Sequence, residues 1–184
     1  MVEVAQHRIK RSPVIAGPTA GGKSALAVAV AREFERRGLG AGEVVTADAF
    51  QVYRGMDIGT AKPTEAERAG VPHHLIDVVE PSEGFTVHQW LGLAESAIEA
   101  IRARGNVPIV AGGSHLFIKS LLEGLFEGPG GDAELRAELE AVELGELRAE
   151  LERVDPQAAE RIHPNDRRRT VRALEVFRLT GRPI

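Results

Sequence analysis

A run of eight residues near the N-terminus has the residue types and spacing that bind phosphate groups. The pattern G-x-x-x-x-G-K-[ST] is matched in full by Gly17, Pro18, Thr19, Ala20, Gly21, Gly22, Lys23 and Ser24. Its glycines let backbone N–H groups turn toward an anion, its lysine adds positive charge, and its serine offers a hydroxyl to Mg²⁺. The alternative is a glycine-rich turn with a chance Gly-Lys-Ser. The motif predicts a di- or triphosphate site with magnesium, but it does not identify the molecule that carries the phosphates.

An acidic residue, Asp48, follows the apolar run at 43–47 and could serve the same site. Its carboxylate could hold magnesium through water or act as a base. The alternative is an aspartate that caps a helix or a turn. An ordinary P-loop NTPase also needs a residue that positions water or an acceptor, and often an arginine finger. No such set is evident in the sequence, so the motif alone does not assign nucleotide hydrolysis.

The elements that must position these residues alternate between strands and helices. Short apolar runs predict strands at 14–16, 43–47, 75–79 and 107–111. Helical spacing and capping residues predict helices at 24–37, 64–67 and 86–104. Alternation of this kind implies parallel βαβ units, and continuous apolar strands fit a sheet that is covered on both faces. The sequence therefore predicts an α/β, three-layer fold of the P-loop NTPase type with a parallel sheet.

The composition changes after about residue 122. A Gly/Pro-rich linker covers 125–131, and residues 132–160 contain ten acidic residues against three arginines. From 161 to 184 the sign reverses, with seven arginines against two acidic residues. Apolar residues recur at helical spacing in the acidic stretch. We therefore expect an α/β core at 1–121 and a small helical insert or appendage domain at 122–184.

The overall composition excludes several classes of protein. The chain has 184 residues, of which 43% are hydrophobic and 27% charged, and its net charge is −4; it is neither a disordered chain nor a broadly basic one. Without cysteine it has no disulfide framework, Cys-based zinc site or thiol nucleophile. The longest apolar run, Ala25 to Ala31, is far shorter than the roughly 18 residues of a membrane helix. We expect a cytoplasmic protein with no membrane partner.

Several blocks of the sequence resemble the tRNA dimethylallyltransferases, also called tRNA isopentenyltransferases. These blocks are Asp48 to Thr64, Val71 to Asp77, Gly112 to Ser114, His163 to Asp166 with the arginines that follow, and Val171 to Gly181. The resemblance runs in the correct order from about residue 13 to the end of the sequence. It implies transfer of a dimethylallyl group from dimethylallyl diphosphate to N6 of an adenine next to the anticodon of tRNA, with release of diphosphate. The loop at 17–24 would hold the prenyl diphosphate, with Mg²⁺ near Ser24.

Residue roles follow from the same resemblance. Asp48 matches the general base that takes a proton from the adenine amine, and Ser114 stands where the family has a threonine near the leaving-group oxygen. Lys23 would neutralise charge on the diphosphate. Contacts with the tRNA anticodon stem-loop are implied for Asp48, Ala49, Phe50, Gln51, Arg136, Arg168, Arg169 and Arg172. The alternative for the arginines is a solvated helix face or a balance to the acidic stretch at 132–160.

The sequence departs from the family pattern in four respects. Gly21 and Ala49 stand where the family usually has serine or a similar residue, and His115 stands where it has glycine. His115 could donate to a phosphate, or it could be an ordinary packed or exposed histidine. The family's chain also continues past the segment that matches Ile184 and supplies another strand. We therefore expect an open sheet edge that a partner or a dimer could cover.

Other functions stay open on the residues alone. A P-loop small-molecule kinase or an adenylate isopentenyltransferase would share the phosphate loop without needing the arginines. A short relative could bind diphosphate or RNA without turnover, which Gly21 and Ala49 favour. Adjacent His73 and His74 suggest metal ligands, but neighbours in an extended segment point opposite ways. We therefore interpret the two histidines as part of the family's loop.

Overall fold

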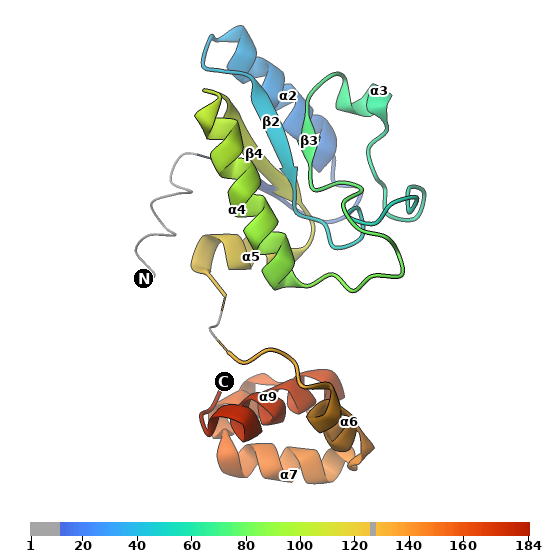
Figure 1. Cartoon of the computed structure of the whole chain (residues 1–184), viewed down its shortest axis with the longest axis vertical. Helices are drawn as coiled ribbons and strands as arrows, with labels where there is room; N and C mark the ends of the chain where they lie inside the picture. Colours follow the sequence, from blue (N-terminus) through green and yellow to red (C-terminus); the bar gives the residue numbers. More distant parts are fainter. Residues whose placement is uncertain (1–11, 126–127) are drawn as a thin grey trace. The chain divides into compact units, whose positions relative to one another are not determined.

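Two compact units divide the chain, one at 1–125 and the other at 126–184. The computed structural model describes residues 12–125 and 128–184 (Figure 1). The first unit contains the sheet and its helices, and the second is helical in its described part. Each unit has a hydrophobic core of its own, so each is described by itself.

A parallel sheet of four strands forms the centre of the first unit. Across the sheet the order is β1 (Val14–Ala16), β4 (Val107–Gly112), β2 (Gly42–Thr46) and β3 (His73–His74). Val45 of β2 lies opposite Val110 of β4, and both side chains are fully buried. Strands with both faces covered are largely apolar, which explains the continuous apolar runs in the sequence. Because β2 and β4 are parallel neighbours, their carboxyl ends finish side by side.

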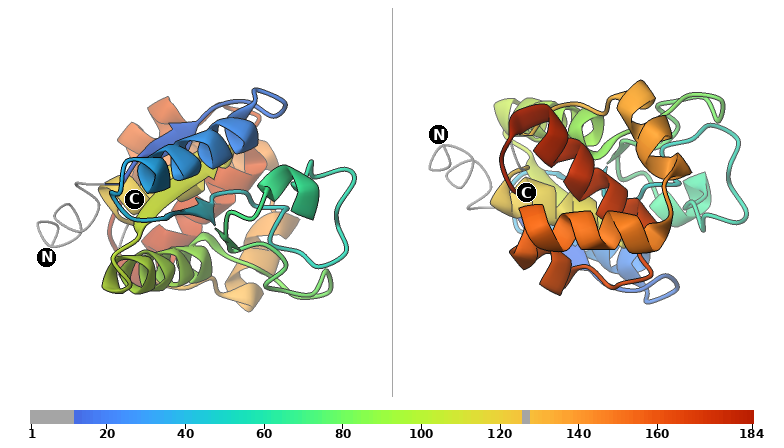
Figure 2. Two further views of the ribbon diagram at one scale, coloured as in Figure 1. Left: turned by 90° about the horizontal axis from the view of Figure 1, so that it is seen from above. Right: turned by 90° about the horizontal axis from the view of Figure 1, so that it is seen from below.

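Helices cover both faces of this sheet and make three layers, which Figure 2 shows in its view from above. α2 (Lys23–Arg36) packs on one face over a core that includes Val44 and Ile109. The other face is covered by α4 (Val87–Ala103) and α5 (His115–Glu123). The predicted α/β three-layer fold with a parallel sheet is confirmed.

Trp90 ties the second helical layer to the sheet close to the end of β2. Its ring stacks on Phe117, with the ring centroids 4.7 Å apart, and both side chains are buried. Its Nε1–H donates to the carbonyl oxygen of Thr46 at 3.0 Å. A buried indole that finds its hydrogen-bond partner fixes one geometry. The Trp90 side chain therefore anchors the last residue of β2, two positions before Asp48.

Two threonines begin helices where the sequence predicts them. Thr64 accepts from the backbone N–H of Glu67 at 3.2 Å and begins α3 (Glu65–Arg68). Thr86 accepts from the backbone N–H of Gln89 at 3.2 Å and begins α4. In both cases the side chain at the third helical position bonds back to the threonine N–H. These capping boxes satisfy N–H groups that have no partner inside the helix, so local sequence suffices to predict them.

The strand predicted at 75–79 is wrong. The segment that pairs with β2 is His73–His74, which ends before the apolar run begins. Leu75 and Asp77 have left-handed φ angles of 63° and 56°, which a regular strand does not contain. Val79 forms an isolated bridge and packs against the core beneath α4. The run is apolar because loop packing buries it, and periodicity cannot distinguish this from strand burial.

The second unit is a small helical bundle. Its helices are α6 (Ala133–Ala141), α7 (Leu144–Val154), α8 (Pro156–Arg161) and α9 (Arg167–Thr180). Aspartates begin three of them by accepting backbone N–H bonds, namely Asp132, Asp155 and Asp166. Its core contains the fully buried side chains of Leu139, Leu147, Leu151 and Leu174. Within 12–125 and 128–184, no helix is long and apolar enough to cross a membrane.

Candidate functional site

The phosphate loop joins β1 to α2. The backbone at Ala20 and Gly22 is left-handed, with φ angles of 62° and 75°, and Gly22 is the N-cap of α2. A turn of this kind followed by a helix directs backbone N–H groups and the positive end of the helix at an anion. Lys23 Nζ donates to the carbonyl oxygen of Pro18 at 2.6 Å. This bond holds the ammonium group across the loop.

The end of β4 closes on both β2 and the phosphate loop. A Cβ at Gly112 would lie 2.0 Å from the carbonyl oxygen of Ala47, so only glycine allows the two strand ends to approach this closely. A Cβ at Gly113 would lie 3.3 Å from the carbonyl oxygen of Gly17 and 3.7 Å from Lys23 Nζ. The ends of β2 and β4 therefore meet the phosphate loop at one end of the sheet.

Asp48 and Ser114 lie at the ends of β2 and β4 and are joined through the backbone. Asp48 Oδ1 accepts from the N–H groups of Phe50 and Gln51 at 2.9 and 3.3 Å. Ser114 Oγ accepts from the N–H of Ala49 at 2.8 Å. Oδ1 is thus engaged, whereas Oδ2 bonds to no residue in the described part of the chain. The hydroxyl proton of Ser114 is still able to donate, so the site combines an acceptor with a donor.

A pocket of about 300 Å³ opens at this end of the sheet. Of the predicted site residues, it is lined by Thr19, Ala20, Gly21, Gly22, Lys23, Ser24, Asp48 and Gln51. The predicted residues of the first unit that lie outside its lining are Gly17, Pro18, Ala49, Phe50 and Ser114. The pocket also reaches Thr60, Glu67 and His73, which sequence reasoning did not assign to the site.

Gln51 is held with its amide nitrogen in the loop. Nε2 donates to the carbonyl oxygens of Thr60 and Ala61, both at 3.1 Å, and the residue is buried. An amide nitrogen has two protons, and both are used by these bonds. The carbonyl Oε1 is therefore the group that Gln51 offers to a ligand. Together with Asp48 it gives the pocket a wall of acceptors, which suits a ligand that carries an amine.

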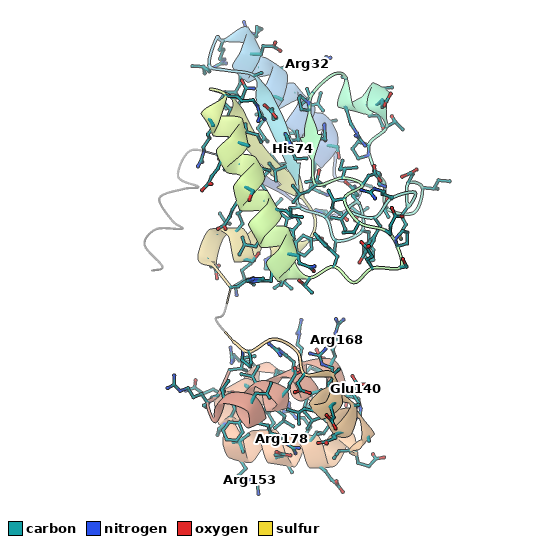
Figure 3. All side chains as sticks on the ribbon, viewed as in Figure 1. Arg32, His74, Glu140, Arg153, Arg168 and Arg178 are labelled. Carbon is teal, nitrogen blue, oxygen red and sulfur yellow. The ribbon has the colours of Figure 1, made fainter. Side chains whose placement is uncertain are left out.

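His73 contributes a buried acceptor that the sequence analysis missed. Its Nδ1 lies 2.8 Å from the carbonyl oxygen of Val71, so Nδ1 carries the proton and Nε2 is the acceptor. Nε2 is buried and has no hydrogen-bond partner among the described residues. Burial lowers the pKa of His73, which keeps the ring neutral. His74, labelled in Figure 3, instead bonds to Glu43 at 2.7 Å. His73 lies in β3, and the pairing of β3 with β2 places its ring where Nε2 is buried.

Lys62 holds the loop that follows Gln51 in place through the contacts of its ammonium group. Its side chain is 4% exposed, and Nζ donates to the carbonyl oxygen of Tyr53 at 2.7 Å. Nζ also pairs with the carboxylates of Asp57 and Asp77, at 2.8 and 2.5 Å. Burial alone would lower the pKa of Lys62, but the bonds that it donates to the two carboxylates raise that pKa above its ordinary value. Sequence reasoning missed this role because one partner is 15 positions away.

The arginines predicted to bind tRNA all lie in the second unit. Arg136 and Arg172 bond to the buried carboxylate of Glu175, at 2.9 and 2.7 Å. Arg168 and Arg169 are exposed on α9. A pocket of about 670 Å³ in this unit is lined by Arg136, Glu140, Arg167, Arg168, Val171 and Arg172. Three of the four predicted arginines therefore share one cationic pocket.

Comparison with known proteins gives one family and many relatives. Residues 51–184 match the family model described as IPP transferase. The chain is 55% identical over 170 residues to a tRNA dimethylallyltransferase of Anaeromyxobacter dehalogenans (strain 2CP-1), covering 90% of this chain and 54% of the relative. It is 52% identical over 175 residues to that of Methylococcus capsulatus, covering 93% and 54%. The chain thus spans about half the length of the curated relatives it matches.

Solved structures agree with these relatives. The full-length tRNA isopentenylpyrophosphate transferase from Bacillus halodurans superposes with a TM-score of 0.61 at 43% identity, covering 95% of this chain and 57% of that one. A eukaryotic dimethylallyltransferase acting on tRNA superposes with a TM-score of 0.79 at 35% identity, covering 95% and 43%. The similarity therefore extends over nearly the whole chain, including its helical unit.

Proposed function

The chain belongs to the IPP transferase family, and from this premise we propose that it acts as a tRNA dimethylallyltransferase. In this reaction a dimethylallyl group passes from dimethylallyl diphosphate to N6 of an adenine next to the anticodon, and diphosphate is released. The observation that carries the proposal is a single pocket lined by the phosphate loop, Asp48 and Gln51. Transfer to an amine needs a phosphate site and a proton acceptor within reach of each other.

The diphosphate binds at the phosphate loop, against the N–H groups at the start of α2 and the ammonium group of Lys23. To reach it, Lys23 exchanges its bond with the Pro18 carbonyl for one with a phosphate oxygen. In the described part of the chain no cluster of three His, Asp or Glu side chains could hold a metal. Mg²⁺ nevertheless fits, because the hydroxyl of Ser24 lines the pocket and this ion takes few protein oxygens beside phosphates and waters. When bound, it neutralises charge on the diphosphate.

Asp48 takes the proton that the amine must lose. As N6 bonds to the first carbon of the dimethylallyl group, the bond from that carbon to the diphosphate oxygen breaks, and its electron pair leaves with the diphosphate. A proton passes from N6 to Oδ2 of Asp48. Oδ1 stays bonded to backbone N–H groups, which fixes the carboxylate orientation. Ser114 lies beside this pocket and not in its lining, but its hydroxyl proton is available, and we assign it to the leaving oxygen. Gln51 Oε1 accepts the second hydrogen of the amine.

The acceptor adenine enters this pocket from an RNA loop. It must leave its stack to do so, and an aromatic side chain can take the place of a neighbouring base. Phe50 is 61% exposed beside Asp48 and supplies such a side chain. The arginines of the helical unit bind phosphates of the same tRNA. A cytoplasmic location, where tRNA is abundant, is part of this proposal.

The free edge of β1 gives a place for a partner. Within the described residues β1 pairs on one side only, with β4. The unpaired N–H and C=O groups of an edge strand are a template for another strand. In our proposal a second copy of this chain, or another partner protein, covers this edge.

Calorimetric titration with dimethylallyl diphosphate and Mg²⁺ tests the donor site. We expect binding by the chain and a loss of roughly tenfold or more in affinity for Lys23→Ala, because a charge-assisted interaction is removed. The matched control is Lys119→Ala, which removes the same charge from an exposed position on α5 outside the pocket. Affinity in that variant should stay unchanged.

Parallel titrants separate the competing functions. Binding of ATP with no affinity for the prenyl diphosphate would overturn the proposal and favour a P-loop kinase. An anticodon stem-loop RNA and AMP are then offered as acceptors in a transfer assay. Product on the RNA supports the proposal, whereas product on AMP alone would identify an adenylate isopentenyltransferase.

A further inference from the structure

A buried carboxylate on α9 organises the arginine pocket of the helical unit. The side chain of Glu175 is 0% exposed. Its oxygens accept from the backbone N–H of Asp132 at 2.8 Å, from Arg136 Nη2 at 2.9 Å and from Arg172 Nη1 at 2.7 Å. Burial alone would raise the pKa of Glu175, but the bonds from Arg172, Arg136 and Asp132 hold it below the ordinary value. The residue is therefore an ionised acid between two arginines.

Backbone groups lie against both guanidinium groups. Arg172 Nη2 donates to the carbonyl oxygen of Pro129 at 2.8 Å. Arg136 lies against Gly131, where a Cβ would come within 2.7 Å of its Nη2. A guanidinium has five N–H donors in a planar fork. The bonds to Glu175 and to the backbone use only part of them, so each arginine keeps donors for a ligand.

The remaining lining of this pocket adds positive charge. Arg168 is exposed and has no bond to any residue within the described ranges. Arg167 donates to the carbonyl oxygens of Glu140 and Val142 at 2.9 Å, which ties α9 to the end of α6. Arg168 and Glu140 are labelled in Figure 3, on the helical unit. Four arginines thus line the pocket with Glu140, and the carboxylate of Glu175 pairs with two of them. Arginines still outnumber the two acids, and this excess of positive charge fits an anion.

Phosphate is the anion that this geometry suits. Two planar forks at fixed positions match the oxygens of phosphate groups, which arginine binds bidentately. An ion pair buried in a protein interior is a weak source of stability, because the cost of removing both charges from water offsets their attraction. Arginines whose side chains are already ordered lose less entropy when a ligand binds.

We propose that Glu175 is a positioning residue that presets Arg136 and Arg172 to bind phosphates of the tRNA backbone. The inference rests on the proposed function for the identity of the ligand. It adds that the acid, although negatively charged, strengthens the binding of a negatively charged ligand. The change in net charge alone predicts the opposite sign.

The proposal and the change in net charge predict opposite changes in RNA affinity, so one substitution in the full chain distinguishes them. Glu175→Gln changes the net charge from −4 to −3, and by charge alone this should tighten the binding of RNA. Our proposal expects the reverse: roughly tenfold weaker binding of a fluorescent anticodon stem-loop RNA in anisotropy titrations. The slope of log Kd against log salt should also fall, by about 0.7 to 0.9 for each phosphate that the arginines no longer neutralise.

Glu150→Gln is the matched control. Glu150 lies in the same unit and pairs with Arg178, another arginine of α9, at 2.8 Å, but it does not line the pocket. The substitution makes the same change in charge. We expect unchanged or slightly tighter RNA binding, with an unchanged salt slope.

Two outcomes would overturn the inference. If Glu175→Gln folds, by circular dichroism, and binds the RNA as tightly as the unsubstituted chain or more tightly, Glu175 has no positioning role. If the unsubstituted chain does not bind the RNA, the proposed function fails first, and the inference loses its ligand.

Should Glu175→Gln fail to fold, Gly131→Ala decides. This substitution changes no charge, and the backbone of Gly131 is not left-handed, so alanine is allowed there. The added Cβ displaces the end of the Arg136 side chain. Weaker RNA binding with a reduced salt slope would support the preset site, and unchanged binding would refute it.

Discussion

The carboxylate of Asp48 serves two purposes at once. One oxygen accepts backbone N–H bonds from Phe50 and Gln51, and this fixes the side chain in a pocket that the phosphate loop also lines. The other oxygen is the proton acceptor in the proposed transfer. An asparagine would keep the first function and lose the second.

We therefore expect Asp48→Asn to lower the rate of dimethylallyl transfer by about 10²- to 10⁴-fold, the usual contribution of a general base. Single-turnover transfer to an anticodon stem-loop measures this rate. Glu80→Gln is the control, because Glu80 forms an exposed pair with Arg54 outside the pocket. Transfer at the unsubstituted rate in Asp48→Asn would contradict the assignment of the base.

At this scale, contiguous motifs were predictable and long-range interactions were not. The phosphate loop and Asp48 stand in recognisable blocks, and the structure gathers most of them into one pocket. Lys62 and His73 also lie in blocks that resemble the family, but their roles could not be predicted from the sequence. Lys62 is buried because Asp77 lies beside it, and the Nε2 of His73 is buried because β3 pairs with β2. Only the folded chain creates these environments.

Among the elements, local signals predicted the starts of helices better than the extent of strands. The capping boxes at Thr64 and Thr86 act within three residues, so they survive in any tertiary context. The apolar run at 75–79 depends on what covers it, and left-handed residues prevent it from being a strand. The close packing of α2 on β2 depends on a single residue, the glycine at the first position of β2.

Gly42 allows α2 to lie directly on β2. A Cβ there would lie 2.3 Å from the Cα of Ala31. We expect Gly42→Ala to lower the free energy of unfolding by about 1–3 kcal/mol, as overpacking does. At Gly59 nothing lies within 4 Å of a Cβ, so Gly59→Ala should change it by less than about 0.5 kcal/mol. Denaturant titration measures both, and equal effects would contradict the close-packing argument.

The chain consists of two units, and within 12–125 and 128–184 their cores share no residue. Their buried ionisable groups differ. The sheet unit contains His73, whose pKa burial lowers, and Glu43, whose burial is outweighed by bonds from Asn106, His74 and Arg104 that lower its pKa. The helical unit contains Glu175, with a lowered pKa of the same origin. The two units should therefore respond differently to acid.

Acid acts on the two units in different pH ranges. Below pH 6.5 His73 takes up a proton in the unfolded chain, whereas burial keeps it neutral in the folded sheet unit. Because the unfolded state then binds more protons, the sheet unit loses stability as the pH falls. Glu175 stays ionised in the folded unit where the unfolded chain is protonated, so its contribution is retained above pH 4.5 and lost below. Calorimetry should show the sheet unit weakening first, between pH 6.5 and 4.5. The early loss should disappear in His73→Gln, and parallel loss in both units would contradict this assignment.

The covalent link between the two units has a consequence for avidity. In the proposed function, a tRNA held by the arginines of one unit would be offered to the pocket of the other at an effective concentration in the roughly millimolar range, as for other short connections. Each site can then be weak by itself while the pair retains the RNA. Weak individual sites also separate quickly from a modified product. Cleavage between Leu125 and Gly128 would leave both cores and the Arg172–Pro129 bond intact and would still abolish this gain.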